Sequence, residues 1–246
     1  MSEQRTALVT GGASGIGRAI SRRLAADGMA VTVADLDGEA ASQVAEEIDG
    51  TPWVVDLADT AALEDLSLNC DVLVNNAGIQ RINPIQDYRP HDWRLIHRLM
   101  VESPFLLIRA ALPAMYERGW GRVVNLSSVH GLRASTHKSA YVAAKHALEG
   151  LSKVTALEGG PHGVTSNCIC PSYVRTPLVE GQIADQARTH DIPEDQVVEQ
   201  VMLTQGAVKR LVEPEEVAAL AGFLAGQDAG MVTGASYTMD GGWSAR

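Results

Sequence analysis

The stretch Thr10-Gly11-Gly12-Ala13-Ser14-Gly15-Ile16-Gly17 follows a short apolar run and opens an amphipathic helical pattern. Its glycines allow the backbone to turn tightly and to approach a bound pyrophosphate closely, while the helix N-terminus offers free N–H groups to that anion. The position at a strand-to-helix junction makes the signal more specific than a lone glycine cluster. We predict a dinucleotide-binding turn whose contacts come from Gly11, Ser14, Gly15, Ile16 and Gly17.

The rest of the chain continues this strand-then-helix order. Short apolar runs predict strands at residues 7–10, 30–34, 53–55, 72–75, 123–126, 165–169 and 236–239. Helical patterns lie between them, at residues 15–27, 39–48, 92–117, 140–157 and 214–225. Near-continuous apolar strands are typical of a sheet covered on both faces. The alternation therefore predicts an α/β fold, a single doubly wound Rossmann-type domain over residues 1–246 with a mostly parallel seven-stranded sheet.

Composition narrows the class of protein. The chain has 246 residues, of which 46% are hydrophobic, and a net charge of −10, which disfavours nucleic acid and anionic lipid as partners. A strand pattern already occupies residues 6–10, and no run of about 18 apolar residues predicts a membrane span. Cys70, Cys168 and Cys170 lie in apolar contexts without metal-ligand spacing. We expect buried reduced thiols, no metal and a cytoplasmic protein.

Two acidic residues follow predicted strands near the glycine turn. Asp35 ends the second strand, 18 residues after Gly17, where a carboxylate accepts hydrogen bonds from the adenosine ribose and repels a 2′-phosphate. This predicts NAD rather than NADP as the cofactor. Asp56 ends the third strand, where its carboxylate is placed to accept from the adenine amino group. For both residues the alternative is a solvated turn position.

A serine, a tyrosine and a lysine form a candidate catalytic set. Ser128 closes the fifth predicted strand, and Tyr141 and Lys145 lie four residues apart on one face of the next helix. A free phenol has a pKa near ~10 and is a poor base at neutral pH. We expect the Lys145 ammonium and a positive nicotinamide ring to lower the pKa of Tyr141, so that it takes an alcohol proton. The Ser128 hydroxyl would hold the substrate oxygen.

Taken together, these motifs resemble the short-chain dehydrogenase/reductase family over the whole chain. The resemblance also rests on Asn75-Asn76-Ala77-Gly78 after the fourth strand and on Cys170-Pro171-Ser172. It implies a homotetramer and an NAD site. The further cofactor contacts that it implies are Leu57, Asn76, Ala77, Gly78, Lys145 on the nicotinamide ribose, Pro171, and Val174 and Thr176 at the carboxamide end.

One position departs from the family pattern. The family usually has an asparagine midway along the helix before the fifth strand, which helps to free a backbone carbonyl that holds a water on the path from the lysine to solvent. Met100 stands there, and a thioether cannot form an amide's hydrogen bonds. Pro104 follows four residues later and removes the helical donor of the Met100 carbonyl. We hypothesise that Pro104 frees this carbonyl; alternatively, Met100 only packs and the relay is weaker.

Five further side chains suggest the substrate. His130 lies two residues after Ser128, and Lys138 three residues before Tyr141, so a cation and an imidazole flank the reacting carbon, which suits a carboxylate. Gln80, Gln182 and Trp243 complete a resemblance to the D-3-hydroxybutyrate dehydrogenase branch of the family. That resemblance implies that Gln80, His130, Lys138 and Gln182 hold the acid, that Trp243 walls off a methyl end, and that (R)-3-hydroxybutyrate and NAD give acetoacetate and NADH.

The sequence leaves the role of one segment and the exact function open. The polar segment 177–211 is a candidate substrate lid or, alternatively, a surface insertion with two ordinary helices. Ser172-Tyr173 replaces the Gly-Trp more frequent in the branch, and the segment between Asp56 and Cys70 is short enough to trim one helix. The function is then either that of the branch, or reduction of another ketone, sugar or ketoacyl group, or cofactor binding without turnover.

Overall fold

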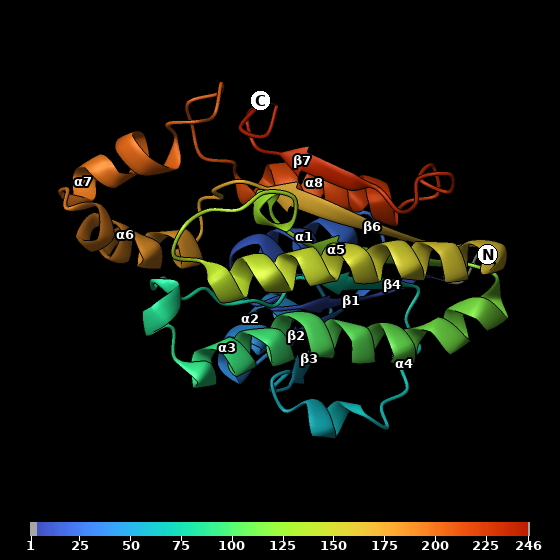
Figure 1. Ribbon diagram of the computed structural model, residues 1–246. Helices are drawn as coiled ribbons and strands as arrows, with labels where there is room; N and C mark the ends of the chain where they lie inside the picture. The colour runs from blue at the N-terminus through green and yellow to red at the C-terminus, as the bar shows by residue number, and fades with distance from the viewer. Residues whose placement is uncertain (1–3, 246) are drawn as a thin grey trace.

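A seven-stranded parallel sheet forms the centre of the computed structural model, which describes residues 4–245 (Figure 1). The strand order is β3-β2-β1-β4-β5-β6-β7, and every neighbouring pair is parallel. The strands are β1 (Thr6–Thr10), β2 (Ala30–Asp35), β3 (Thr51–Val54), β4 (Val72–Asn75), β5 (Gly121–Leu126), β6 (Val164–Pro171) and β7 (Ser236–Met239). The predicted doubly wound sheet is confirmed, and the order reverses between β1 and β4, where such folds bind their ligands.

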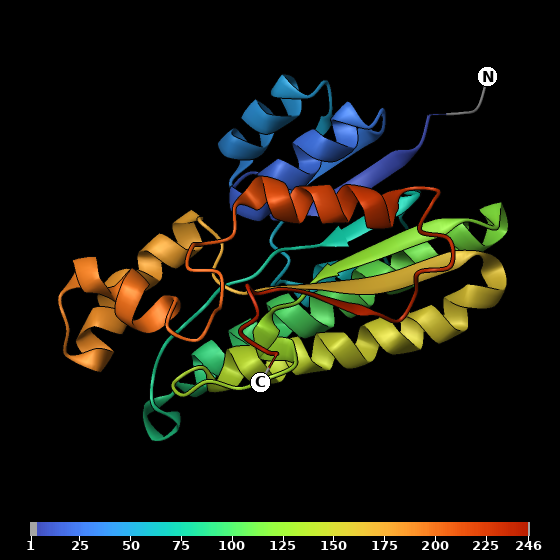
Figure 2. The same ribbon diagram turned by 90° about the horizontal axis from the view of Figure 1, so that it is seen from above.

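Helices cover both faces of the sheet and make three layers (Figure 2). On one face lie α1 (Gly15–Ala26), α2 (Gly38–Glu47) and α8 (Pro214–Ala225). On the other face lie α3 (Pro90–His97), α4 (Ser103–Arg118) and α5 (Ser139–Gly159). Two apolar clusters fill the spaces between the layers, one with Val9, Ile20 and Leu224 and the other with Leu73 and Leu107. The strands are therefore buried on both sides, which explains their continuous apolar sequences.

The turn after β1 depends on a close backbone approach. A Cβ atom on Gly17 would lie 2.0 Å from the carbonyl oxygen of Gly11, a distance that no side chain allows. The Asn76 side chain closes the same turn from the next strand, because its amide nitrogen donates to the carbonyls of Thr10 and Gly11 at 2.9 and 3.1 Å. The first turn of α1 is thus held against the ends of β1 and β4 by backbone contact.

Three predicted boundaries differ in the structure. β3 ends at Val54, so Asp56 lies two residues past the strand instead of ending it. β5 ends at Leu126, and Ser128 caps a 3-10 turn, Val129–Gly131, instead of closing the strand. The short connection before β4 carries only a 3-10 turn, Thr60–Leu63, which bears out the expected loss of a helix there. Strand ends are set by sheet pairing, which local sequence does not encode.

The predicted helix over residues 92–117 is longer and contains a change of helical type. It runs without a break from Pro90 to Arg118, and its middle, Arg98–Glu102, is a π-helical turn. Contrary to the sequence expectation, this helix is long and apolar enough by length and composition to cross a membrane. Half of its most apolar window is buried inside the molecule, as in the core helix of a globular protein.

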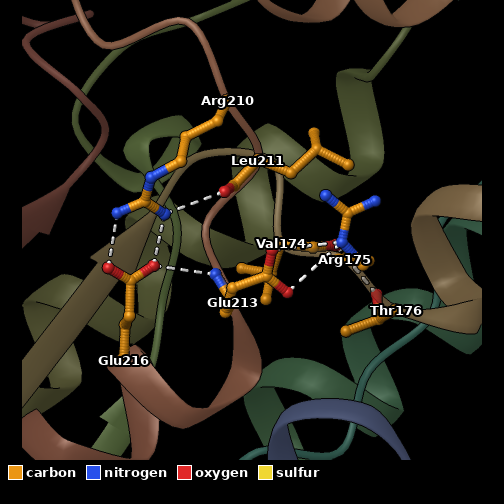
Figure 3. Close-up of polar contacts among 7 residues, drawn as sticks. All are labelled: Val174, Arg175, Thr176, Arg210, Leu211, Glu213 and Glu216. Atoms are coloured by element: carbon orange, nitrogen blue, oxygen red, sulfur yellow. Dashed lines mark hydrogen bonds and ion pairs between the residues drawn. The ribbon is translucent and has the colours of Figure 1, made fainter.

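Segment 177–211 projects from one end of the sheet (Figures 1 and 2). It contains α6 (Pro177–His190), α7 (Glu194–Val197) and a π turn, Val198–Met202, which share a small apolar cluster of their own. Val174 and Val212 form a parallel bridge where the segment leaves and returns. Figure 3 shows the ion pairs beside this bridge, Arg175–Glu213 and Arg210–Glu216. The two ends of the segment are therefore fastened to each other.

We predict that Gly17→Ala destabilises the protein by about 3 kcal/mol or more, because the added methyl group must displace the Gly11 backbone. Gly150→Ala is the matched control, since a Cβ on this exposed residue of α5 has nothing within 4 Å and should gain about 0.5–1 kcal/mol. Urea unfolding of both variants measures the two changes. Equal stability of the two variants would contradict the proposed role of the close approach.

Candidate active site

A cavity of about 1030 Å³ opens at the carboxyl ends of the strands and runs from the glycine turn to segment 177–211. It brings together every site residue predicted from the sequence except Gly17. The predicted residues that line it are Gly11, Ser14, Gly15, Ile16, Asp35, Asp56, Leu57, Asn76, Ala77, Gly78, Gln80, Ser128, His130, Lys138, Tyr141, Lys145, Pro171, Val174, Thr176, Gln182 and Trp243. Gly17 was expected to contact the cofactor, but the structure gives it the packing role described above.

The glycine turn fits a dinucleotide. Gly11 and Gly15 both adopt positive φ, 60° and 49°, and both line the cavity. A Cβ on Gly15 would lie 3.1 Å from the Thr176 side chain, so only a bare backbone leaves the channel open between α1 and the opposite wall. Ser14 caps α1 in an extended conformation, and its side chain makes no capping hydrogen bond. The helix N-terminus is therefore available to a phosphate group.

Asp35 is fixed beside the glycine turn by two backbone groups. Its Oδ2 accepts from the Ala13 N–H at 3.0 Å, and its Oδ1 accepts from the Asp37 N–H at 3.2 Å. These bonds hold the carboxylate at the cavity wall next to Leu36, where no cation neutralises it by a salt bridge within residues 4–245. Asp56 is exposed and accepts from the Ala58 N–H at 2.8 Å.

Ser128, Tyr141 and Lys145 converge in the middle of the cavity. Ser128 Oγ accepts from the His130 N–H at 3.2 Å and donates to the Pro171 carbonyl at 3.4 Å. Lys145 Nζ lies 5.5 Å from the centre of the Tyr141 ring and donates to the carbonyl of Leu126 at the end of β5. The carbonyl at the end of β5 thus fixes the Lys145 ammonium, and α5 places Lys145 and Tyr141 next to each other.

The pKa of Tyr141 differs from the value expected from the sequence. Burial raises the pKa of Tyr141 to about 12, opposed by a hydrogen bond from Ser128. The expected lowering by Lys145 is not found with the protein's own groups. Burial also lowers the pKa of Lys145 to about 8, so the lysine still carries a proton at neutral pH. Tyr141 is therefore a neutral phenol in the protein alone, suited to give a proton to a ketone oxygen.

Glu149 is a buried carboxylate that sequence reasoning missed. It lies one helical turn after Lys145 on the buried face of α5 and is 4% exposed. Its Oε1 accepts from Cys170 Sγ at 3.1 Å, and its Oε2 accepts from Ser236 Oγ at 2.5 Å. Its negative charge raises the pKa of Lys145 and so partly offsets the effect of burial. The i, i+4 spacing from Lys145 was the available signal. The three cysteines are free and buried, as predicted.

Met100 and Pro104 lie where the long helix changes type. Met100 is 1% exposed and packs under Gly78, whose Cβ would lie 3.5 Å from the Met100 sulfur. The Ser103 N–H donates five residues back, to Arg98, and Pro104 follows without an N–H. The predicted disturbance of the helix is present here as the π turn.

The far end of the cavity holds buried polar groups without protein partners. His130 Nε2 and Gln80 Oε1 are buried and have no hydrogen-bond partner within residues 4–245. Lys138 is 5% exposed, and its ammonium donates to the Tyr173 hydroxyl at 3.1 Å. Across residues 4–245 no carboxylate forms a salt bridge with it. Because the desolvation of a cation is costly, this group is a candidate to bind an anion.

His130 is a neutral hydrogen-bonding group rather than a second cation. Burial, with the neighbouring charges of Lys138 and His146, lowers the pKa of His130 to about 3. Its ring lies 6.0 Å from the Trp243 ring and 6.2 Å from the Tyr141 ring, measured between ring centres. Gln182 lines the same end from α6, but its amide nitrogen donates to Leu178 within that helix at 3.1 Å. Trp243 and His130 thus form one wall of the far end of the cavity. We call this end the chamber; Gln80, Lys138, Tyr173 and Gln182 also line it.

Comparison with known proteins gives consistent results. A family model described as enoyl-(acyl carrier protein) reductase matches residues 11–244. The D-beta-hydroxybutyrate dehydrogenase of Rhizobium meliloti strain 1021 is 45% identical over 98% of this chain and 99% of its own length. The enzyme of the same name from Cupriavidus necator is 42% identical over 100% of both chains. The cyclohexanol dehydrogenase of Acinetobacter sp. strain SE19 is 34% identical over 98% of this chain and 96% of its own length.

Solved structures of moderate sequence identity share the fold. A levodione reductase superposes with a TM-score of 0.89 at 31% identity, covering 98% of both chains. A protein described as a putative 2-deoxy-d-gluconate 3-dehydrogenase from Agrobacterium tumefaciens, with NADP bound, gives 0.86 at 32% identity and covers 100% of this chain and 98% of that chain. Family model, full-length relatives and structural neighbours agree: the chain belongs to the short-chain dehydrogenase/reductase family and is an oxidoreductase.

Proposed function

We propose that the protein interconverts (R)-3-hydroxybutyrate and acetoacetate with NAD. The observation that carries this proposal is the Lys138 ammonium, which is buried at the cavity wall without a protein counterion. A carboxylate would supply the missing charge, and its oxygens would accept hydrogen bonds from the buried His130 Nε2–H and from the amide nitrogen of Gln80, which lines the same cavity. A substrate with an acid group near the reacting carbon satisfies all three groups.

The chemistry follows from the positions of three side chains. A bound oxidised nicotinamide would supply the hydride acceptor and a positive charge that favours the phenolate form of Tyr141. Tyr141 takes the hydroxyl proton, and Ser128 donates to the developing carbonyl oxygen. The charged Lys145, fixed on the Leu126 carbonyl, stabilises the phenolate. In the reverse direction the high intrinsic pKa of Tyr141 keeps it ready as an acid.

A small acid suits this chamber better than an uncharged alcohol. Two relatives at 45% and 42% identity are named D-beta-hydroxybutyrate dehydrogenase, whereas one at 34% is named cyclohexanol dehydrogenase. A cyclic alcohol would leave the ammonium of Lys138 buried and without an anion. The stacked His130 and Trp243 rings limit the room beyond the reacting carbon. The acid is therefore the proposed substrate, and reduction of an uncharged ketone is the second candidate.

NAD is the proposed form of the cofactor. The Asp35 carboxylate is held at the cavity wall, where it would repel a 2′-phosphate. One structural neighbour at 32% identity has NADP bound, so the proposal of NAD rests on the Asp35 carboxylate and not on membership of the family.

We also propose that segment 177–211 acts as a lid, because α6 lines the far end of the cavity. A cytoplasmic homotetramer remains our expectation; the free buried thiols suit a reducing compartment.

The direct test follows NADH absorbance after mixing the protein with NAD and (R)-3-hydroxybutyrate. We expect turnover with the (R)-acid and little with the (S)-acid or with (R)-2-butanol, which lacks the carboxylate. Tyr141→Phe should reduce turnover at least about a hundredfold while NADH still binds, because only proton transfer is lost. Turnover of neutral alcohols but not of the acid would transfer the assignment to the second candidate.

Asp35→Ser tests the cofactor assignment. We expect the ratio of kcat/KM for NADP to that for NAD to rise at least about tenfold, since the repulsion of the 2′-phosphate and a ribose hydrogen bond are lost together. Asp56→Ser is the control, because this exposed carboxylate lies farther along the cavity and should change both values alike. An unchanged ratio in Asp35→Ser would rule out this carboxylate as the discriminator.

Pro104→Ala tests the proton path that the sequence suggested. The substitution gives the helix an N–H next to the π turn, and we expect this donor to occupy a carbonyl that otherwise holds a water. The rate of proton transfer should fall, seen as a lower kcat and a shifted pH profile with KM for NAD unchanged. Pro113→Ala, in the same helix, is the control. Identical kcat and pH profiles in Pro104→Ala and wild type would refute the relay role.

A further inference from the structure

Tyr173 stands at the edge of the candidate acid site, in the connection between β6 and α6. Its side chain lines the cavity and is partly buried. Its hydroxyl oxygen accepts from Lys138 Nζ at 3.1 Å, and the ammonium lies 4.9 Å from the ring centre. The lysine is therefore held at the hydroxyl edge of the ring.

The Tyr173 hydroxyl accepts a hydrogen bond at this contact but does not donate one. Lys138 donates one of its three N–H groups to Tyr173, so the Tyr173 O–H hydrogen must point to another acceptor. Within residues 4–245 the Tyr173 hydroxyl makes no other hydrogen bond that the structure shows. An oxygen that accepts from an ammonium becomes a better donor through its own proton, because the two bonds polarise each other. The free O–H thus belongs to the same chamber as the unpartnered His130 and Gln80 atoms.

Tyr173 also lies close to the reacting centre. Its phenol is among the groups that raise the pKa of Tyr141, which places the two tyrosines within electrostatic reach of each other. A ligand that touches the Tyr141 hydroxyl with one end is therefore near Lys138 and Tyr173 with the other. Lys138 is the N-cap of α5, and Tyr141 lies in the first turn of the same helix. In a 3-hydroxy acid a single carbon separates the alcohol carbon from the carboxylate carbon, so the two ends of such an acid suit groups that lie within one helical turn.

We propose that the Tyr173 hydroxyl binds the substrate carboxylate together with Lys138, and that the pair sets the preference for acids over neutral ketones. One carboxylate oxygen accepts from a second N–H of the ammonium and the other from the phenol O–H, so that two charge-assisted hydrogen bonds are added to the existing bond between the two side chains. This inference deepens the proposed function and rests on it for the identity of the acid. The alternative is that Tyr173 only packs against the apolar cluster of segment 177–211.

Tyr173→Phe separates these roles because it keeps the ring and removes only the hydroxyl. We compare acetoacetate with acetoacetamide, its neutral isostere, in the reduction direction. The KM for acetoacetate should rise about tenfold, the effect of one hydrogen bond to a charged group, with kcat nearly unchanged. The KM for acetoacetamide and the Kd for NADH should stay at their wild-type values. Tyr237→Phe, on β7 and away from the cavity, is the matched control.

A binding measurement decides the inference even without turnover. Calorimetry follows butyrate, which has no reacting oxygen, and butyramide as they bind to the NADH-loaded protein. Wild type should bind butyrate about tenfold more tightly than Tyr173→Phe does, and the two proteins should bind butyramide alike. If butyrate does not bind wild type, or binds both proteins equally, the inference is overturned, whatever the turnover assays show.

The two proposals fail in different ways. Turnover of the (R)-acid by wild type with an unaltered KM for acetoacetate in Tyr173→Phe would leave the proposed function standing and remove Tyr173 from the site. Tyr173-dependent binding of butyrate without turnover of 3-hydroxybutyrate would keep the carboxylate site and point to another acid. Equal rises in KM for acetoacetate and acetoacetamide would mean that Tyr173 acts through packing alone, against the inference.

Discussion

The contact between the first turn of α1 and the end of β1 is the constraint on which the site depends. Gly17 approaches the Gly11 carbonyl so closely that no side chain fits, and the Asn76 amide closes the turn from β4. Thr10 Oγ1 in turn accepts from the Asn76 N–H at 2.9 Å. These bonds join β1 and β4 at the point where the strand order reverses. The junction therefore positions Gly11 and Asn76, both of which line the cavity at the point where such folds bind their ligands.

A second constraint is the buried positive charge at the opposite end. Lys138 caps α5 just before Tyr141, so the helix that carries the catalytic pair also carries the cation. Burying an ammonium without a counterion costs stability, and proteins retain such groups where a ligand offsets the cost. His130 stays neutral beside it because burial and the Lys138 charge both oppose its protonation. The proposed substrate carboxylate would therefore meet one cation with neutral groups around it.

The sequence predicted the sheet and its seven strands, and nearly all of the predicted site residues line the cavity, because glycine turns and buried parallel strands leave local patterns. It failed where the deciding contact is distant in sequence. Glu149 had only a spacing to Lys145 as a signal, since Cys170 and Ser236 reach it from other strands. The pKa of Tyr141 depends on burial, which no spacing encodes.

Tyr173 shows how the substrate end and segment 177–211 depend on each other. Its backbone carbonyl accepts from the Val212 N–H at 2.9 Å, where the segment returns to the body of the protein. Its ring packs on the cluster that contains Val179 and Met202, and its hydroxyl holds Lys138. One residue thus belongs to the base of the segment, to its apolar cluster and to the candidate acid site. The position of segment 177–211 and the position of the Lys138 ammonium are therefore linked through Tyr173.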